Sequence, residues 1–203
     1  MHYPSFFDSV KKITLYDPLA EFLGAVDGGV IEYSYLDVVK LAGHSCPTVA
    51  GAYLMTQKAL AALWGDDVPQ RGSIKVEFHN PLQSGVTGVI ANVITLITGA
   101  TMDSGFKGLA GRFDRRDLLF FNAAIEGEIR FTRLDTGASV TVGYHPDIVP
   151  GPPEMMGLLQ KTLSGMASVE EARAFGVLWQ ERVMRIFEKS DDPRLVVLDH
   201  AGR

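Results

Sequence analysis

The chain has 203 residues, of which 46% are hydrophobic and 21% charged, and its net charge at pH 7 is −5. This length suffices for one sizeable domain, with or without a small helical appendage. General nucleic-acid binding requires a basic face that displaces counterions, so the acidic balance predicts no nucleic-acid partner.

The single cysteine, Cys46, excludes an internal disulfide and a zinc site made of four cysteines. A lone thiol suits a reducing compartment. The first residues show no basic region followed by an apolar stretch and a cleavage site. The most apolar stretch, 85–100, is too short and too polar to span a bilayer. We therefore expect a cytoplasmic protein without a membrane partner.

The N-terminal part of the chain predicts three helices. The first covers 16–26, with Asp17 placed to accept free backbone N–H groups and Pro18 at the first helical position. A short second helix covers 35–43, and a longer third helix rich in alanine and glycine covers 46–65. Gly43 and Gly65 are the last residues of these two ranges and are expected to end the helices.

The middle of the chain predicts a mainly antiparallel sheet. Apolar and polar residues alternate over 72–80, which is typical of a half-buried strand. The stretch 85–101 is rich in β-branched residues and predicts a central strand. The stretch 120–145 predicts a hairpin that turns at Asp135-Thr136-Gly137. Helices before and after such a sheet indicate the α+β class, with N-terminal helices packed on the sheet and C-terminal helices following it.

A proline-rich and glycine-rich segment divides the expected core, 1–148, from an expected helical C-terminal extension, 149–203. In this extension Ser168 and Glu171 have the spacing of a capping box and predict the start of a long amphipathic helix. The stretch 194–199 predicts a final edge strand.

The most chemically informative stretch is Gly43-His44-Ser45-Cys46-Pro47. A thiol in the first turn of a helix lies at the positive end of the helix dipole, which favours the thiolate. His44 can direct its ring toward the same point, and both groups are zinc ligands. The alternative is that Cys46 is a small buried apolar residue and that His44 only caps or packs.

This stretch resembles the opening motif of the FmdE family, whose members are similar to one component of the enzyme formylmethanofuran dehydrogenase. The family signature is Gly-His-x-Cys-Pro followed by small residues and glycine. The positions that match here are Gly43, His44, Cys46, Pro47 and Gly51. The resemblance implies an α+β core that dimerises and a transition-metal site at this motif.

A second stretch, 92–108, resembles the family segment Asp-Ala-Ile-Gln, two residues, Thr-Gly-Cys-Thr and a Gly/Asn loop. The positions that match are Ile94, Thr98, Gly99 and Thr101. Ala100 stands where the family has cysteine, and Asn92 stands where it has aspartate. The resemblance covers about residues 15–145. Some relatives also carry a cysteine-rich zinc finger at the C-terminus, which residues 150–203 cannot form because they contain no cysteine.

A metal needs three or four ligands, and the first motif supplies two. We expect the third from His79, at the end of the strand over 72–80, or from a partner chain. His145 and Asp103 are further candidates, with a surface residue and a turn residue as their alternative interpretations. The densest basic group, 112–117, predicts a solvated turn or strand end, with an anion contact as the alternative.

The sequence thus predicts a metal-binding FmdE-like protein of unknown reaction that holds zinc or another divalent transition metal through His44, Cys46 and His79. A homodimer is expected, and an open coordination position could bind a small-molecule ligand. One alternative is a metal-free enzyme with Cys46 as nucleophile and His44 as base. Another, which follows from the family name, is an accessory subunit of a larger oxidoreductase.

Overall fold

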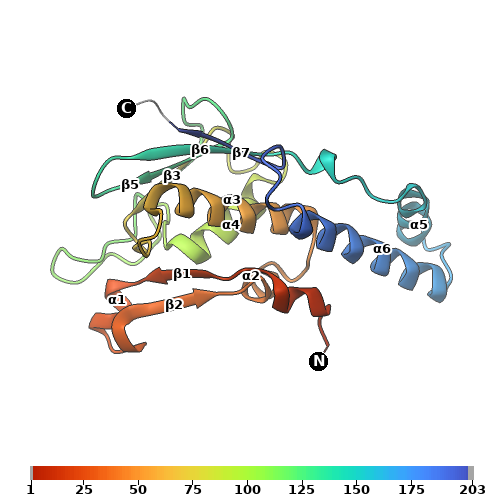
Figure 1. The fold of residues 1–203 in the computed structure, drawn as a ribbon, viewed down its shortest axis with the longest axis horizontal. Helices are drawn as coiled ribbons and strands as arrows, with labels where there is room; N and C mark the ends of the chain where they lie inside the picture. The colour runs from red at the N-terminus through yellow and green to blue at the C-terminus, as the bar shows by residue number, and fades with distance from the viewer. Residues whose placement is uncertain (1, 201–203) are drawn as a thin grey trace.

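The computed structural model describes residues 2–200 of the chain. The fold is α+β, as the sequence predicts: the helices of residues 47–64 and 87–98 lie between a five-stranded sheet and a two-stranded ribbon (Figure 1). Among the described residues, no helix is both long and apolar enough to cross a membrane.

The elements of the first half of the chain are, in order, η1 (Ser5–Ser9), β1 (Ile13–Tyr16), α1 (Pro18–Phe22), η2 (Asp27–Gly29), β2 (Val30–Tyr33), α2 (Tyr35–Ala42), α3 (Pro47–Trp64), β3 (Ile74–Phe78) and α4 (Thr87–Thr98). Those of the second half are β4 (Leu119–Phe120), β5 (Ile129–Arg133), β6 (Ser139–Tyr144), η3 (Pro146–Ile148), α5 (Pro153–Leu163), α6 (Val169–Glu188) and β7 (Val196–His200).

The five-stranded sheet has the order β4-β3-β5-β6-β7, and only the β3–β4 pair is parallel. Val76, Phe131 and Val140 are paired across β3, β5 and β6, and all three are fully buried. Their side chains share one face because side chains alternate along a strand. The predicted hairpin is confirmed as β5 and β6, and the predicted strand over 72–80 is confirmed as β3.

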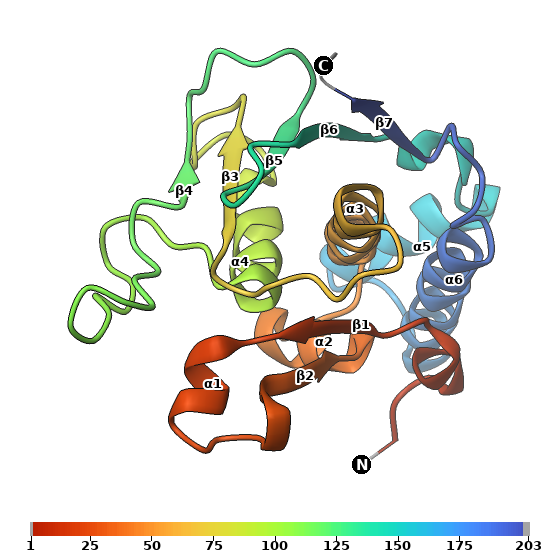
Figure 2. The same cartoon turned by 60° about the vertical axis from the view of Figure 1, so that its left-hand side comes forward.

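Helix α3 is the centre of the fold. It is enclosed by the sheet, α4, α6 and the β1–β2 ribbon (Figure 2). Its residues from Val49 to Thr56 are all buried, which is typical of a helix without a solvent face. Ala50, Gly51 and Ala52 lack bulky side chains and so allow neighbouring elements to approach this helix closely.

The prediction of a central strand over 85–101 is wrong, because Thr87–Thr98 forms α4. Ala91, Ile94 and Thr98 are buried at helical spacing, and α4 packs against α3. Contacts along this face override the preference of β-branched residues for strands. The helix ends at Gly99, which takes the left-handed conformation at φ 73°.

The N-terminal segment also differs from the expected helices. The helix predicted over 16–26 is limited to α1, Pro18–Phe22. Strands β1 and β2, which flank it, form an antiparallel ribbon where the sequence pattern predicts no strands. The predicted cap is present, since a carboxylate oxygen of Asp17 accepts from Leu19 N at 2.9 Å and Ala20 N at 3.2 Å.

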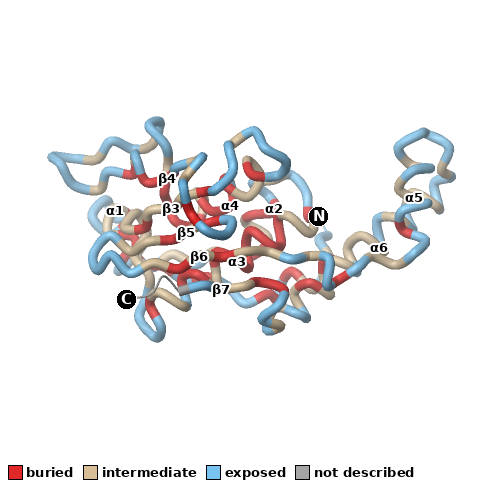
Figure 3. The backbone as a smooth tube through the Cα atoms, turned by 90° about the horizontal axis from the view of Figure 1, so that it is seen from above, coloured by how far each residue is buried: buried red, intermediate tan, exposed pale blue. Residues whose placement is uncertain are grey.

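The C-terminal part has two regions. Helix α5 and the first turns of α6 form an arm that projects from the body (Figure 3), whereas Val183 and Ile186 of α6 are buried in the main core. The capping box of Ser168 and Glu171 is confirmed. The predicted final strand is confirmed as β7, which pairs with β6 at the edge of the sheet. Residues 201–203 lie outside the described part of the chain.

Candidate functional site around Cys46

The turn between α2 and α3 places Cys46 at the start of the central helix. Gly43 ends α2 in the left-handed conformation, with φ 76°. Cys46 has an extended backbone and is the N-cap of α3, and its Sγ accepts from Val49 N at 3.5 Å. Pro47, the first helical residue, has no N–H that would need a partner. The predicted position of the thiol at a helix start is confirmed.

Side chains from distant elements hold the residue before the cysteine. Tyr35 of α2 forms a 2.9 Å hydrogen bond between its hydroxyl and Ser45 Oγ. The Ser45 carbonyl accepts from Trp179 Nε1 at 3.0 Å and from Gln180 Nε2 at 3.1 Å, both from α6. Ser45 is buried by these contacts.

The residue after the cysteine is held from the sheet. Tyr144, at the end of β6, donates from its hydroxyl to the Pro47 carbonyl at 2.9 Å. Burial raises the pKa of Tyr144 and of Tyr35 far above the ordinary phenol value, so both hydroxyls keep their protons at physiological pH. The backbone on both sides of Cys46 is therefore held by side chains of β6 and α6, and the Ser45 side chain is held by α2.

His44 lies on the surface beside this turn. Its Nδ1 is 2.9 Å from the Ala42 carbonyl oxygen. A carbonyl can only accept, so Nδ1 is the donor of this bond. No hydrogen bond to His44 Nε2 is found in the part of the chain that the structure describes. Among the described residues no hydrogen bond joins the side chains of His44 and Cys46.

His79 is exposed at the end of β3, and its Nδ1 donates to the Ile125 carbonyl at 3.1 Å. The described residues contain no group of three or more His, Cys, Asp or Glu side chains placed to hold a metal. His44, Cys46 and His79 therefore do not form such a group within the described part of one chain. His145 and Asp103, the other candidates, are exposed. The described part of one chain does not supply the three protein ligands that a metal site requires.

The second family-like stretch runs through the end of α4. Ala100 is fully buried, and its N–H donates to Thr98 Oγ1 at 3.2 Å. Gly99 and Thr101 line a cavity of ≈ 430 Å³, and neither His44 nor Cys46 is among the described residues that line it.

An ion cluster that the sequence pattern does not predict lies beside this cavity. Asp17 is nearly fully buried; its Oδ2 lies 2.9 Å from Arg71 Nη1 and its Oδ1 lies 2.7 Å from Arg115 Nη2. The prediction of a solvated turn over 112–117 is therefore wrong at Arg115, whose side chain is 6% exposed. The separation of these three residues in sequence leaves no local signal of their contact.

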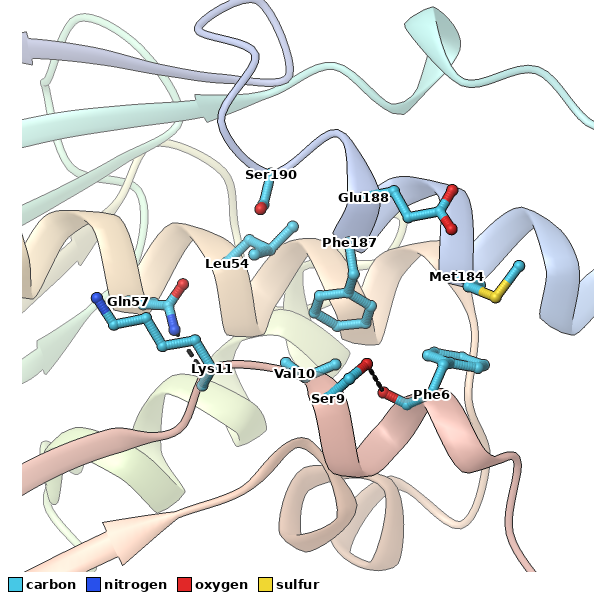
Figure 4. A pocket seen from close by; sticks show the side chains of 10 residues that line it. All are labelled: Phe6, Ser9, Val10, Lys11, Leu54, Gln57, Met184, Phe187, Glu188 and Ser190. Carbon is cyan, nitrogen blue, oxygen red and sulfur yellow. Dashed lines mark hydrogen bonds between the residues drawn. The ribbon is translucent and has the colours of Figure 1, made fainter.

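A second hollow, of ≈ 280 Å³, lies where η1 meets α3 and α6 (Figure 4). Two of its polar side chains are engaged within the protein: Ser9 Oγ donates to the Phe6 carbonyl, and Gln57 Nε2 donates to the Lys11 carbonyl.

Gly51 of α3 provides a test of how the turn is held. A Cβ atom at this position would overlap the ring of Tyr144. We expect Gly51→Ala to lower the free energy of unfolding by about 1–3 kcal/mol, because a buried ring must move. Urea denaturation followed by circular dichroism measures this change.

The matched control is Gly176→Ala in α6, where nothing lies within 4 Å of an added Cβ. This substitution should stabilise the protein by about 0.5–1 kcal/mol, the usual advantage of alanine in a helix. Equal effects at Gly51 and Gly176 would contradict the close packing of Tyr144 on α3.

No family model matches the chain, and no curated protein matches it. The likeness to the FmdE family therefore rests on the two sequence motifs.

Proposed function

We propose that this is an FmdE-like protein that binds zinc or another divalent transition metal, with Cys46 Sγ as the first ligand and His44 Nε2 as the second. One observation supports it most: the backbone carbonyls on both sides of Cys46 are bound by side chains from β6 and α6, and the Ser45 side chain is bound by Tyr35 of α2. Such support is what a binding group needs if its position is to be kept before the ligand arrives.

The choice of residue at this helix start also supports the proposal. Serine, threonine, aspartate and asparagine are the side chains that cap helices well. The cap contact of Cys46 is made by sulfur, 3.5 Å from Val49 N, and sulfur is a weak acceptor. Capping alone would be served better by serine, so we attribute the thiol to ligand binding. Cys46 is only partly buried, although it also packs against the hydrophobic core.

The remaining ligands are proposed to come from a second copy of the chain, because His79 does not form a metal-holding group with the other two in the described part of one chain. A homodimer would bring a second exposed His44 or another donor to the site. Exposed apolar side chains on the α5–α6 arm support self-association; they are Met156, Leu163, Met166, Val169 and Val177. We also propose that the protein is cytoplasmic, because a single unpaired cysteine suits a reducing compartment.

The test is the metal content of protein purified without an affinity tag or a nickel column. Inductively coupled plasma mass spectrometry should find stoichiometric metal in the wild type and none in Cys46→Ser. His44→Ala should lower occupancy, whereas His145→Ala, at another exposed histidine, should not. Light scattering gives the mass of each protein with and without chelator.

Serine keeps a capping oxygen at position 46, so Cys46→Ser should change the free energy of unfolding by less than about 1 kcal/mol. Loss of metal in this variant can therefore not be attributed to unfolding. Metal-free wild-type protein, or equal metal in the wild type and Cys46→Ser, would contradict the proposal.

The second candidate is a metal-free enzyme with Cys46 as nucleophile, which the position of the sulfur at the start of α3 favours. The local hydrogen bond of His44 to Ala42 speaks against His44 as its base. Rapid alkylation of Cys46 by iodoacetamide in metal-free protein, lost in His44→Ala, would favour this candidate. An accessory subunit of a larger oxidoreductase is a third possibility that rests on the family name alone.

A further inference from the structure

The ion cluster of Asp17, Arg71 and Arg115 holds an uncompensated positive charge. Two guanidinium groups share one carboxylate, which leaves a net charge of +1. Asp17 accepts four hydrogen bonds: its Oδ1 accepts from two backbone N–H groups of α1 and from Arg115, and its Oδ2 accepts from Arg71. The acceptor sites of a carboxylate are then filled, and its single negative charge balances only one of the two cations.

The two arginines differ in how their donors are used. Arg71 donates from Nε to the Ile97 carbonyl at 3.1 Å and from Nη2 to the Leu96 carbonyl at 3.0 Å. Arg115 donates only from Nη2, to Asp17, and its buried Nε and Nη1 have no partner among the described residues. Buried donors without partners are rare and costly, and the cost is larger on a charged group.

Electrostatics agree with this view of Arg115. Burial lowers the pKa of its guanidinium below the ordinary value, although Asp17 raises it. The guanidinium is thus less stable in its charged form than in water. A second negative group beside Arg115 would stabilise the charged form of its guanidinium.

The cavity of ≈ 430 Å³ offers the space for such a group. Arg71 and Arg115 lie in its wall together with the neutral polar residues Asn92, Thr95 and Thr101. No Asp or Glu is found among the described residues that line it. The volume is in the range of small-molecule sites, and its charge favours an anion.

The rest of the cavity wall is apolar. Leu19, Leu41, Leu96 and Phe106 complete it. Leu41 is 47% and Phe106 42% exposed, so apolar surface reaches solvent beside the cationic wall. This arrangement suits a ligand with an anionic head and an apolar body.

Two glycines keep Arg115 in place. A Cβ at Gly72 would overlap its guanidinium, and a Cβ at Gly99 would lie 3.1 Å from its Nη1. Both glycines have positive φ, 80° and 73°. The Arg115 carbonyl accepts from Thr101 N at 3.0 Å and from Thr101 Oγ1 at 2.6 Å. The side chain is therefore held between two backbone segments at the cavity.

The geometry points to a binding site for a small organic carboxylate with an apolar chain, its carboxylate placed against the positive charge of Arg71 and Arg115 in the cavity wall. A planar guanidinium matches a carboxylate through two parallel hydrogen bonds. Phosphate shares this chemistry, but the net charge of +1 is balanced by one negative charge, which favours the carboxylate. The site is independent of the function proposed for Cys46, which does not line this cavity.

Isothermal titration calorimetry with acetate, hexanoate and decanoate tests the proposal. We expect hexanoate or decanoate to bind the wild type and Arg115→Met to weaken that binding at least tenfold, because hydrogen bonds between charged groups are lost. Hexanamide, which lacks the charge, should not bind, and inorganic phosphate should bind more weakly than the best carboxylate.

Arg116→Met is the matched control, since Arg116 is the next residue and pairs with Asp114 at the surface. It should leave carboxylate binding unchanged. Binding that is equal in the wild type and Arg115→Met would overturn the proposal, as would the failure of all three carboxylates to bind. Tighter binding of phosphate than of any carboxylate would overturn the ligand class.

A second variant, Thr95→Phe, tests the same site without removing a buried charge, so its result does not depend on whether Arg115→Met folds. Thr95→Phe adds a ring from α4 into the cavity and leaves the contacts of Asp17 with both arginines intact. It should abolish carboxylate binding while the protein stays folded by circular dichroism. Retained affinity in a folded Thr95→Phe protein would place the ligand elsewhere and contradict the proposal.

Discussion

Asp17→Asn should lower the free energy of unfolding by about 3–5 kcal/mol, the usual cost of removing one partner from a buried ion pair. Asparagine has nearly the same shape and also caps helices well, so the start of α1 is kept. What is lost is the carboxylate that contacts both Arg71 and Arg115. Urea denaturation followed by circular dichroism measures the change.

The control is Asp27→Asn, at an exposed position at the start of η2, which should change stability by less than about 0.5 kcal/mol. If Asp17→Asn changed the free energy of unfolding as little as Asp27→Asn, the ion cluster would contribute little to stability. Since Asp17→Asn raises the net charge around Arg115, saturating carboxylate should restore part of its lost stability if the cavity binds such ligands.

The same residue gives stability a defined dependence on pH. Burial alone would raise the pKa of Asp17, but its hydrogen bond from Arg71 and the charge of Arg115 bring this pKa below the ordinary value. A lowered folded pKa gives stability that is complete above the unfolded value of about 3.9 and is lost as pH falls through the folded value. Asp17→Asn should remove this part of the acid dependence.

Ile186→Ala should lower the free energy of unfolding by about 2–5 kcal/mol, the usual cost of truncating a buried isoleucine. Ile186 lies in α6 and is fully buried in the same core cluster as α3 and the sheet. The loss should therefore affect the whole fold and leave a single unfolding transition.

Fluorescence of Trp64, at the end of α3, reports on the core once Trp179 is replaced by phenylalanine. In that background Ile186→Ala should lower the urea midpoint seen by Trp64. Val177→Ala, in the same helix at a position that is 58% exposed, should change stability by less than about 0.5 kcal/mol. An unchanged Trp64 transition in Ile186→Ala would show that α6 unfolds separately from the core.

Much of the local structure could be predicted because its cause is local. Asp17 caps α1, Gly43 ends α2, and Ser168 with Glu171 opens α6. In each case one side chain or one backbone angle satisfies groups only a few residues away. The start of α3 at Cys46 belongs to this class, which is why the thiol could be placed before any contact was known.

The candidate site could be predicted only in part. The position of Cys46 follows from the helix start, but its anchors do not: Tyr144 and Trp179 are far away in sequence and belong to a strand and a helix. The expected approach of His79 also depended on how β3 lies relative to α3. Distances of this kind follow from the packing of whole elements.

The sequence by itself determined the α+β class, the bounds of α2 and α3, the start of α6, the β5–β6 hairpin and the position of the lone thiol, because periodicity and capping act over a few residues. Only the tertiary structure decided that Thr87–Thr98 is a helix and that Arg115 is buried. β-branched residues accept either state, and contacts with α3 select the helix. A charged side chain enters the interior only where a distant carboxylate meets it, and Asp17 is brought there by the fold.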